Sequence, residues 1–247
     1  MARRLDIDRI LQQWPFEPGE ISARLVKAGD GREVLQMRVE MGVLQLETSG
    51  RPDGQKPSGS DTYFEFLQKA AQEQGDDLFV LDADQCTEAD REFMQFYHRR
   101  VCWLALREFR RAATDADHTL AFMNFVRDHS PGEEWTLSHE QYRPFVLFHR
   151  TQAATLARLE EEGAEAAMQE ITVGLDQFHA LFVQYDAEDQ FEEDDLVCRL
   201  QELRDTLREQ YEVQPSLREQ LEAAVAAEQY ELAAKLRDEL SGRHKSA

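Results

Sequence analysis

The residues of this chain that are best suited to chemistry are the aspartates and the histidine of the segment DADH. Asp115, Asp117 and His118 carry groups that commonly bind catalytic zinc, iron or manganese. Helical ligands usually come in pairs three or four residues apart, as in HExxH or ExxH, and neither pattern occurs. We therefore predict no metal site and no cofactor here, and we interpret Thr114 or Asp115 as a helix N-cap.

Nucleophilic catalysis has no better support. The GxSxG elbow does not occur, and Cys102 lies between Val101 and Trp103, as expected for a buried and unreactive thiol. The segment GRPDGQKP, with Arg51 and Lys56, could hold an anion, although turn chemistry also explains its Gly, Pro and Asp. The sequence thus predicts a protein without catalytic residues that is not an enzyme.

Composition narrows the classes of partner. The 247 residues include 49 acidic and 28 basic ones, which gives a net charge of -21. Such a charge disfavours direct binding to nucleic acid or to an anionic membrane. No run approaches the ~20 apolar residues that span a bilayer. The three cysteines form no CxxC pair, so we expect a reducing, cytoplasmic location.

The elements that must position these residues begin with a β-ribbon. In residues 20–48, Leu35, Met37 and Val39 alternate with polar residues, which is typical of a half-buried strand. The segment AGDG predicts a hairpin turn, and Gly42 a bulge or a second bend. Because two strands alone are marginal, we expect this ribbon to pack against a helix. Breaks at Gly and Pro predict a loop over residues 49–61.

The pattern turns helical at Tyr63. Apolar residues recur at helical spacing through residues 87–113, with Thr87 as the predicted cap, and further helices follow on either side of Pro131 and Gly163. The segments YHRRVCWLALREF and FHRTQAATLARLE form a weak repeat, in which we expect His98 and His149 to be hydrogen-bonded packing residues. GAEAAMQEITVGLDQF resembles the second helix of a tetratricopeptide-type repeat, so helix pairs in a solenoid or bundle are expected.

The acidic segment DAEDQFEEDD has no glycine and therefore does not fit a calcium loop; we interpret it as a linker or helix start. The predicted fold class is mainly α, with an N-terminal antiparallel β-ribbon or small sheet, a helical-hairpin body and a C-terminal α-hairpin. The predicted regions are the ribbon and loop (1–62), the helical body (63–185), the acidic linker and helix (186–214) and the C-terminal hairpin (215–242).

The C-terminal segment LREQLEAAVAAEQYELAAKLRDEL carries two apolar stripes. Each consists of residues at i, i+4 and i+8 of a helix: Leu217, Leu221 and Val225 in the first, and Leu232, Leu236 and Leu240 in the second. The intervening AAEQY contains no strong helix breaker, but a turn there would bring the stripes together. Two helices of about three turns cannot cover all their apolar faces, so we expect a neighbour to complete them.

The same segment resembles the UVR motif, the helical hairpin named from the excision-repair proteins UvrB and UvrC. The positions that carry the resemblance are Glu228, Tyr230, Glu231, Ala233, Ala234, Arg237 and Asp238. The resemblance implies a docking element that pairs with another copy of itself or with a related hairpin. The alternative is an alanine-rich hairpin that packs on its own body. Residues near GVLQLETSGRPDGQ also resemble uncharacterised bacterial proteins with a C-terminal UVR motif.

The phosphate-binding loop of a UvrB-like helicase and the CxxC zinc sites of other UVR-containing regulators do not occur. We therefore predict a non-enzymatic adapter that docks a protein partner, or itself as a homodimer, through the hairpin. The predicted partner-binding residues are Leu217, Leu221, Val225, Tyr230, Ala233, Leu236, Arg237, Asp238 and Leu240. We expect Leu221→Glu or Leu236→Glu to abolish docking. The alternative function is a small metal-dependent enzyme or regulator that uses the helical body.

Overall fold

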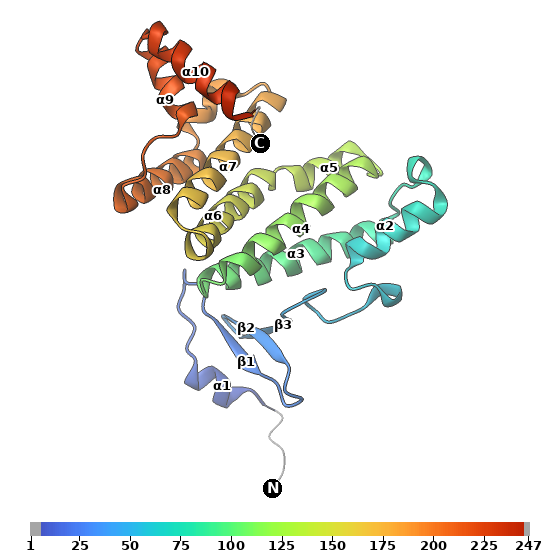
Figure 1. Cartoon of the computed structure of the whole chain (residues 1–247). Coiled ribbons are helices and arrows are strands. Elements are labelled where there is room, and N and C mark those ends of the chain that lie inside the picture. The colour runs from blue at the N-terminus through green and yellow to red at the C-terminus, as the bar shows by residue number, and fades with distance from the viewer. Residues whose placement is uncertain (1–5, 245–247) are drawn as a thin grey trace. The chain divides into compact units, whose positions relative to one another are not determined.

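The computed structural model describes residues 6–244 and confirms the predicted fold class (Figure 1). It is mainly helical, with a small antiparallel sheet near the N-terminus and two antiparallel helices at the C-terminus. The chain forms two compact units, Met1–Gln201 and Glu202–Ala247. Helices and strands of the first unit are α1 (Asp8–Gln13), β1 (Ala23–Lys27), β2 (Glu33–Val39), β3 (Gly42–Glu47), α2 (Tyr63–Gln74), α3 (Ala83–Ala105), α4 (Phe109–Asp128), α5 (Glu133–Glu140), α6 (Arg143–Glu161) and α7 (Ala164–Gln184).

The sheet has the order β1-β2-β3, with both pairs antiparallel. The predicted turn after β1 is present, since the Ala28 N–H donates to the Arg32 carbonyl at 2.8 Å. Gly42 begins a third strand, so it marks a second bend rather than a bulge. Leu35 of β2 is opposite Leu25 on one side and Leu46 on the other, which places these three side chains on one face.

The sheet packs against helices, as expected for so small a sheet. Leu35 and Leu46 are buried together with Cys102 and Trp103 of α3 and with Ala153 of α6. Small residues on the helices let the sheet approach closely. The three strands thereby gain the apolar cover that a two-stranded ribbon would lack.

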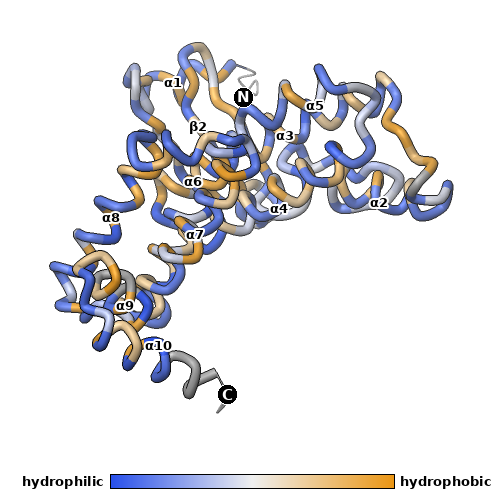
Figure 2. Tube along the Cα trace, turned by 90° about the horizontal axis from the view of Figure 1, so that it is seen from above, coloured by the Kyte–Doolittle hydropathy of each residue, from blue (hydrophilic) through white to orange (hydrophobic). Residues whose placement is uncertain are grey.

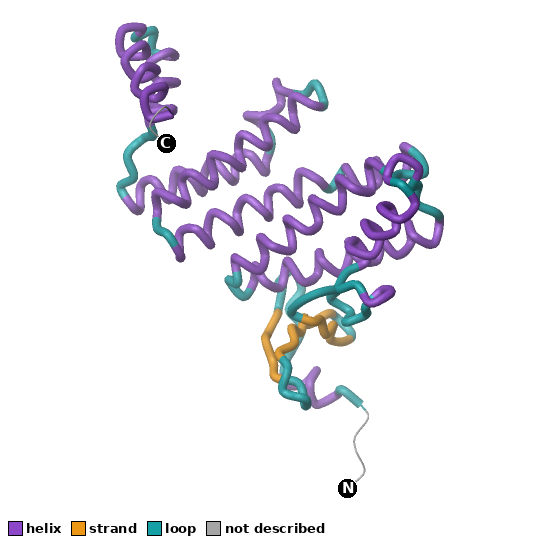
Figure 3. The backbone as a smooth tube through the Cα atoms, turned by 45° about the vertical axis from the view of Figure 1, so that its right-hand side comes forward, coloured by secondary structure: helices purple, strands orange, loops and turns teal. Residues whose placement is uncertain are grey.

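Helices α3, α4, α6 and α7 form a row in which each packs against the next, and the short α5 connects α4 to α6 along the chain (Figures 1 and 3). Gly174 of α7 lies against Thr151 of α6, where an added Cβ would come within 2.1 Å of the threonine Cγ2. The small residue therefore permits close approach of the two helices, as the sequence suggests. Tyr97 lies in the C-terminal half of α3 and Phe148 in the first half of α6, so the two segments of the weak repeat do not open their helices alike.

Two predicted helix caps are wrong, because α3 and α4 begin earlier in the sequence than expected. Thr87 lies inside α3, which begins after Asp82; the Asp82 carboxylate accepts from the Gln85 N–H at 2.8 Å in a capping box. Thr114 and Asp115 are interior to α4, which already begins at Phe109. The chain turns between Ala105 and Phe109, earlier than the helix start that the sequence predicted at Thr114 or Asp115.

Helix ends often use a left-handed residue other than glycine. The second unit contains most of α8 (Asp195–Tyr211) and all of α9 (Leu217–Ala226). The chain turns at a left-handed residue after four helices: at Arg107 after α3, at Asp186 after α7, at Glu212 after α8 and at Glu228 after α9. Glycine is the residue best suited to this conformation, so these four ends have no strong signal in the sequence.

The hydropathy of the chain follows its helices. Figure 2 shows hydrophobic and hydrophilic residues alternating along them, as expected for amphipathic elements packed side by side. One apolar cluster joins α6 and α7 to the start of α8 through Phe148, Phe178, Val197 and Leu200. Among the described residues, no helix is long and apolar enough to cross a membrane.

Candidate functional site

The predicted C-terminal hairpin is present as α9 and α10 (Tyr230–His244), which pack against each other. The turn between them is built by Glu228, whose φ is 57°. Its N–H donates to the Val225 carbonyl at 3.0 Å, and the Gln229 N–H donates to the Ala224 carbonyl at 2.8 Å. This is the hydrogen-bond pattern of a Schellman C-cap, so AAEQY turns without a glycine or proline.

The inner face of the hairpin is closed by its own side chains. Ala224, Ala233 and Leu236 are buried, and Leu217 and Leu221 pack against them partly buried. The alanines allow the helices to approach, and the leucines of the two helices then cover one another. Four predicted partner-binding residues therefore hold the hairpin together in the structure: Leu217, Leu221, Ala233 and Leu236.

Outside these inner contacts, three large apolar side chains of the described part of the hairpin are exposed, and this exterior is called its outer face. Val225, Tyr230 and Leu232 have 53%, 69% and 45% of their surface exposed. Val225 and Leu232 thus leave the stripes in which the helical spacing had placed them. Tyr230 and Leu232 also line a shallow concavity beside the turn, together with Glu228, Gln229, Glu231 and Lys235.

The remaining predicted residues lie further along α10. Arg237 and Asp238 are exposed, and the Arg237 Nη2 to Asp238 Oδ1 distance is 3.3 Å. An exposed pair of this kind contributes little to stability. The side chain of Leu240 lies outside the described part of the structure.

The aspartates and the histidine of DADH separate into different interactions. Asp115 is buried and binds Arg99 in a two-pronged ion pair, with Nε–Oδ2 and Nη2–Oδ1 distances of 2.8 and 2.7 Å. Asp117 pairs with Arg150 at 3.0 Å on the surface. His118 approaches Glu92 at 3.1 Å between its Nε2 and the carboxylate Oε1. Across the described residues, no group of three or more His, Cys, Asp or Glu side chains is placed to hold a metal ion.

The loop with Arg51 and Lys56 was the other candidate, for an anion. Arg51 is buried, and its Nη2 lies 2.9 Å from a carboxylate oxygen of Glu88, whereas Lys56 pairs with Asp61 at 2.9 Å. Glu92, which lies near Arg51, also accepts from the Tyr63 N–H at the start of α2. The cations of this loop therefore bind the chain's own carboxylates: Arg51 fixes the loop to α3, whereas the Lys56 pair lies within the loop.

The other singled-out side chains behave as packing residues. Burial raises the pKa of the Cys102 thiol to about 12, which confirms an unreactive cysteine. His149 is buried and its Nδ1 accepts from the Arg100 Nε at 3.3 Å, which confirms a hydrogen-bonded histidine. His98 is half-buried and burial lowers its pKa, but among the described residues its ring makes no hydrogen bond and instead contacts the ring of Tyr97, so the prediction of a hydrogen-bonded histidine is wrong at this position.

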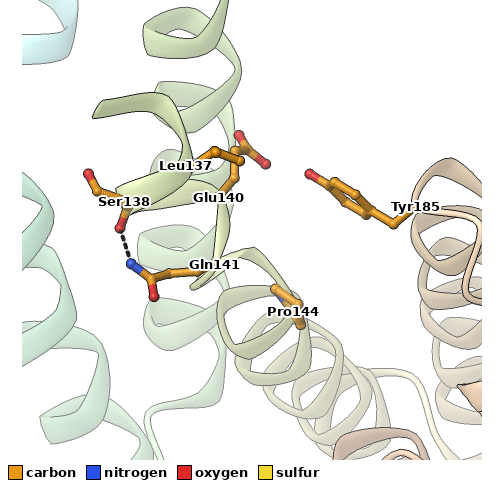
Figure 4. A pocket seen from close by; sticks show the side chains of 6 residues that line it. All are labelled: Leu137, Ser138, Glu140, Gln141, Pro144 and Tyr185. Atoms are coloured by element: carbon orange, nitrogen blue, oxygen red, sulfur yellow. Dashed lines mark hydrogen bonds between the residues drawn. The ribbon is translucent and has the colours of Figure 1, made fainter. Parts of the chain in front are cut away.

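Two concavities of the helical row were not predicted. Figure 4 shows the one beside α5, where the ring of Tyr185 points across the opening toward Glu140. The Glu140 carboxylate accepts from Arg143 Nη2 at 2.6 Å, and the Gln141 side chain donates to the Ser138 carbonyl at 2.9 Å. These polar groups are satisfied within the chain. The second concavity is a cavity around Arg100, whose walls come from helices that only the fold brings together.

Comparisons with known proteins give one finding, which concerns the hairpin. No curated protein and no solved structure matches the chain. Residues 212–242 match the family described as the UvrB/uvrC motif. The matched range contains all of α9 and most of α10, including Glu228 at the turn. The C-terminal hairpin of this chain is therefore a UVR motif, as its sequence predicts.

Proposed function

We propose that this chain is a non-enzymatic adapter that docks through the outer face of its UVR hairpin, and that a second copy of the chain is one partner. The observation that carries the proposal is the exposure of Val225, Tyr230 and Leu232 on a hairpin whose inner face is already filled. Tyr230 and Leu232 line one concavity beside the turn, and exposed apolar side chains that lie together are typical of an interaction site. The UVR motif itself is associated with pairing between hairpins in UvrB and UvrC.

The geometry also changes which substitutions test docking. Leu236 is buried inside the hairpin and Leu221 packs beside it, so a glutamate at either position would disrupt α9 and α10 themselves. Loss of docking in those variants would not distinguish a missing contact from an unfolded hairpin. Val225 and Leu232 are exposed and can be exchanged with the hairpin intact.

The test is the molar mass of the full chain by light scattering. At about 50 µM, a Kd near 1 µM makes most of the wild-type chain dimeric. We expect the Val225→Glu/Leu232→Glu double variant to have the mass of one chain, with an unchanged helical circular dichroism signal. Met41→Glu is the matched control, because Met41 is 88% exposed on the turn between β2 and β3. A monomeric wild-type chain, or a double variant that stays dimeric, contradicts self-docking.

The alternative of a metal-dependent enzyme gains no supporting geometry from the described residues. Asp115 is committed to Arg99, and Asp117 to Arg150. His118 interacts with Glu92 and stacks on Phe96 with ring centroids 3.8 Å apart. Each group serves the packing of the helical row.

A further inference from the structure

A cavity of about 410 Å³ opens between α3, α4, α5 and α6 of the first unit. This volume lies in the range of small-molecule sites. Most of its wall is apolar or aromatic, formed by Phe93, Met94, Tyr97, Met123, Phe145 and Val146. A site of this kind suits a ligand with a short hydrocarbon or aryl body.

One charged side chain, Arg100, lines this cavity and is only 2% exposed. Its Nε donates to the His149 Nδ1 at 3.3 Å, and its Nη1 donates to the Thr119 hydroxyl at 3.0 Å. Both acceptors are uncharged groups. Among the described residues Arg100 forms no ion pair, and its Nη2 has no hydrogen-bond partner. A buried cation without a counterion is costly to a fold.

The preceding residue shows what a satisfied buried arginine looks like in this chain. Arg99 is 4% exposed and binds both carboxylate oxygens of Asp115. That carboxylate is therefore already used. None of the residues that line the cavity carries a carboxylate, and Asp90 pairs with His139, which does line it. The carboxylates around the cavity are thus committed to other groups.

The charge of Arg100 persists in spite of its burial. Burial lowers the pKa of Arg100 to about 10 and outweighs the attraction of the Asp115 carboxylate, which raises it, so the guanidinium stays charged at neutral pH. Burial, and then the charge of Arg100, lower the pKa of His149 to about 4, so this imidazole is neutral and free to accept. The cavity therefore presents a single fixed positive charge.

We propose that this cavity binds a small apolar monocarboxylate, with Arg100 as its counterion. The planar guanidinium can give two parallel N–H bonds to the two carboxylate oxygens. The hydrocarbon or aryl body packs on Phe93, Met123 and Val146. The exposed side chains Met94 and Tyr142 give an apolar entrance. A single positive charge without an ion pair selects a monoanion over phosphate or a dicarboxylate.

The first test compares three probes on the full wild-type chain by titration calorimetry. Octanoate supplies charge and body, octan-1-ol the body alone, and acetate the charge alone. We expect octanoate to bind about tenfold or more tightly than octan-1-ol, because a hydrogen-bonded charge pair adds to the apolar contact. Acetate is expected to give no measurable heat at the same concentrations. Equal affinity for octanoate and octan-1-ol overturns the proposal without any variant.

The second test assigns the preference to Arg100. Arg100→Met is expected to bind octanoate and octan-1-ol alike, and Arg91→Met is the matched control on the exposed face of α3. Should Arg100→Met not fold, Met94→Asp places a negative charge at the entrance on an exposed position. This variant is expected to lower the affinity for octanoate several-fold and to leave the affinity for octan-1-ol unchanged. An octanoate preference that survives in a folded Arg100→Met or is untouched by Met94→Asp overturns the assignment.

Discussion

At Arg99 and Arg100, two neighbouring guanidinium groups of α3 are buried with different partners. Arg99 meets the opposite charge of Asp115, whereas Arg100 meets the neutral His149 and Thr119. In a medium of low polarity, removing one partner of a buried ion pair costs about 3–5 kcal/mol, so the first pair is a fixed structural contact. The second arrangement leaves its positive charge available to a ligand.

The buried His149 makes stability depend on pH. Its folded pKa is about 4, below the value of about 6.5 in the unfolded chain, so between these values only the unfolded state binds the proton. The stabilising contribution is therefore complete above pH 6.5 and is lost as the pH falls toward 4. We expect a loss on the order of 3 kcal/mol, measured as the free energy of unfolding in denaturant.

The comparison variant for this prediction is His149→Asn, which keeps an acceptor for Arg100 and does not titrate. It should lose less stability than the wild type between pH 6.5 and 4.5, because all other titrating groups are shared. His179→Asn, at an exposed histidine, should follow the wild type. Equal losses in the wild type and His149→Asn would falsify the assignment of this pH dependence to His149.

At the scale of elements, the approach of α6 and α7 depends on Gly174. Replacing an interior helical glycine by alanine ordinarily adds about 1 kcal/mol of helix stability. Here the added Cβ would lie 2.1 Å from the Cγ2 of Thr151, a side chain with no exposed surface, so it cannot be accommodated without a shift of the helices. We expect Gly174→Ala to lower the free energy of unfolding by on the order of 1–2 kcal/mol, because overpacking outweighs propensity.

Gly29→Ala is the control for this change. Gly29 lies in the turn between β1 and β2, where an added Cβ meets no atom within 4 Å. Its stability should stay within about 0.5 kcal/mol of the wild type. A Gly174→Ala chain as stable as this control would contradict close packing of α6 on α7.

The turn of the UVR hairpin offers a stabilising substitution. Glu228 holds a left-handed conformation that costs a residue with a side chain about 1–2 kcal/mol and costs glycine little. Glycine also makes the unfolded chain more flexible, and this offsets about 0.4–1 kcal/mol of the stabilisation. We expect Glu228→Gly to slow amide hydrogen exchange in α9 and α10 by a few-fold. Glu231→Gly, three residues later inside α10, should speed it instead; the same direction in both variants would show that the turn is not the cause.

Elements with a repeating pattern could be predicted from the sequence, and those set by distant contacts could not. The alternation around Leu35 gave β2, and the apolar spacing around Leu221 gave the hairpin with its inner contacts. The start of α4 was predicted too late in the sequence, because the chain turns at Arg107 in a left-handed conformation that an arginine does not indicate. The cavity around Arg100 was missed because its partner His149 is 49 residues away.

The sequence predicts which segment forms the site, but not which of its side chains are buried between the two helices and which are exposed. Helical spacing placed Val225 with Leu217 and Leu221, yet the short α9 turns Val225 outward at the helix end, where the Schellman turn begins. Leu232 is likewise in the first turn of α10 and exposed. A difference of this kind arises at helix ends, where only one side of a residue has a neighbouring turn to pack against.

At the scale of the whole molecule, the net charge of -21 opposes any pairing of two copies. Charges on approaching chains repel over about 10 Å at 0.1 M salt and over about 3 Å at 1 M salt. We therefore expect the Kd of the proposed homodimer to fall several-fold when sodium chloride is raised from about 0.05 to 0.5 M, as measured by analytical ultracentrifugation. Potassium chloride should act alike. A dimer that dissociates as salt rises would indicate pairing held by ion pairs instead of Val225, Tyr230 and Leu232.

The left-handed residues that close α3, α7, α8 and α9 have a consequence for how the chain folds. Each such corner is unfavourable for an isolated segment, so a helix pair cut from the protein lacks a local reason to bend back on itself. The corners become favourable only once their flanking helices have found each other. Folding should therefore be more cooperative than a string of independent helical pairs suggests.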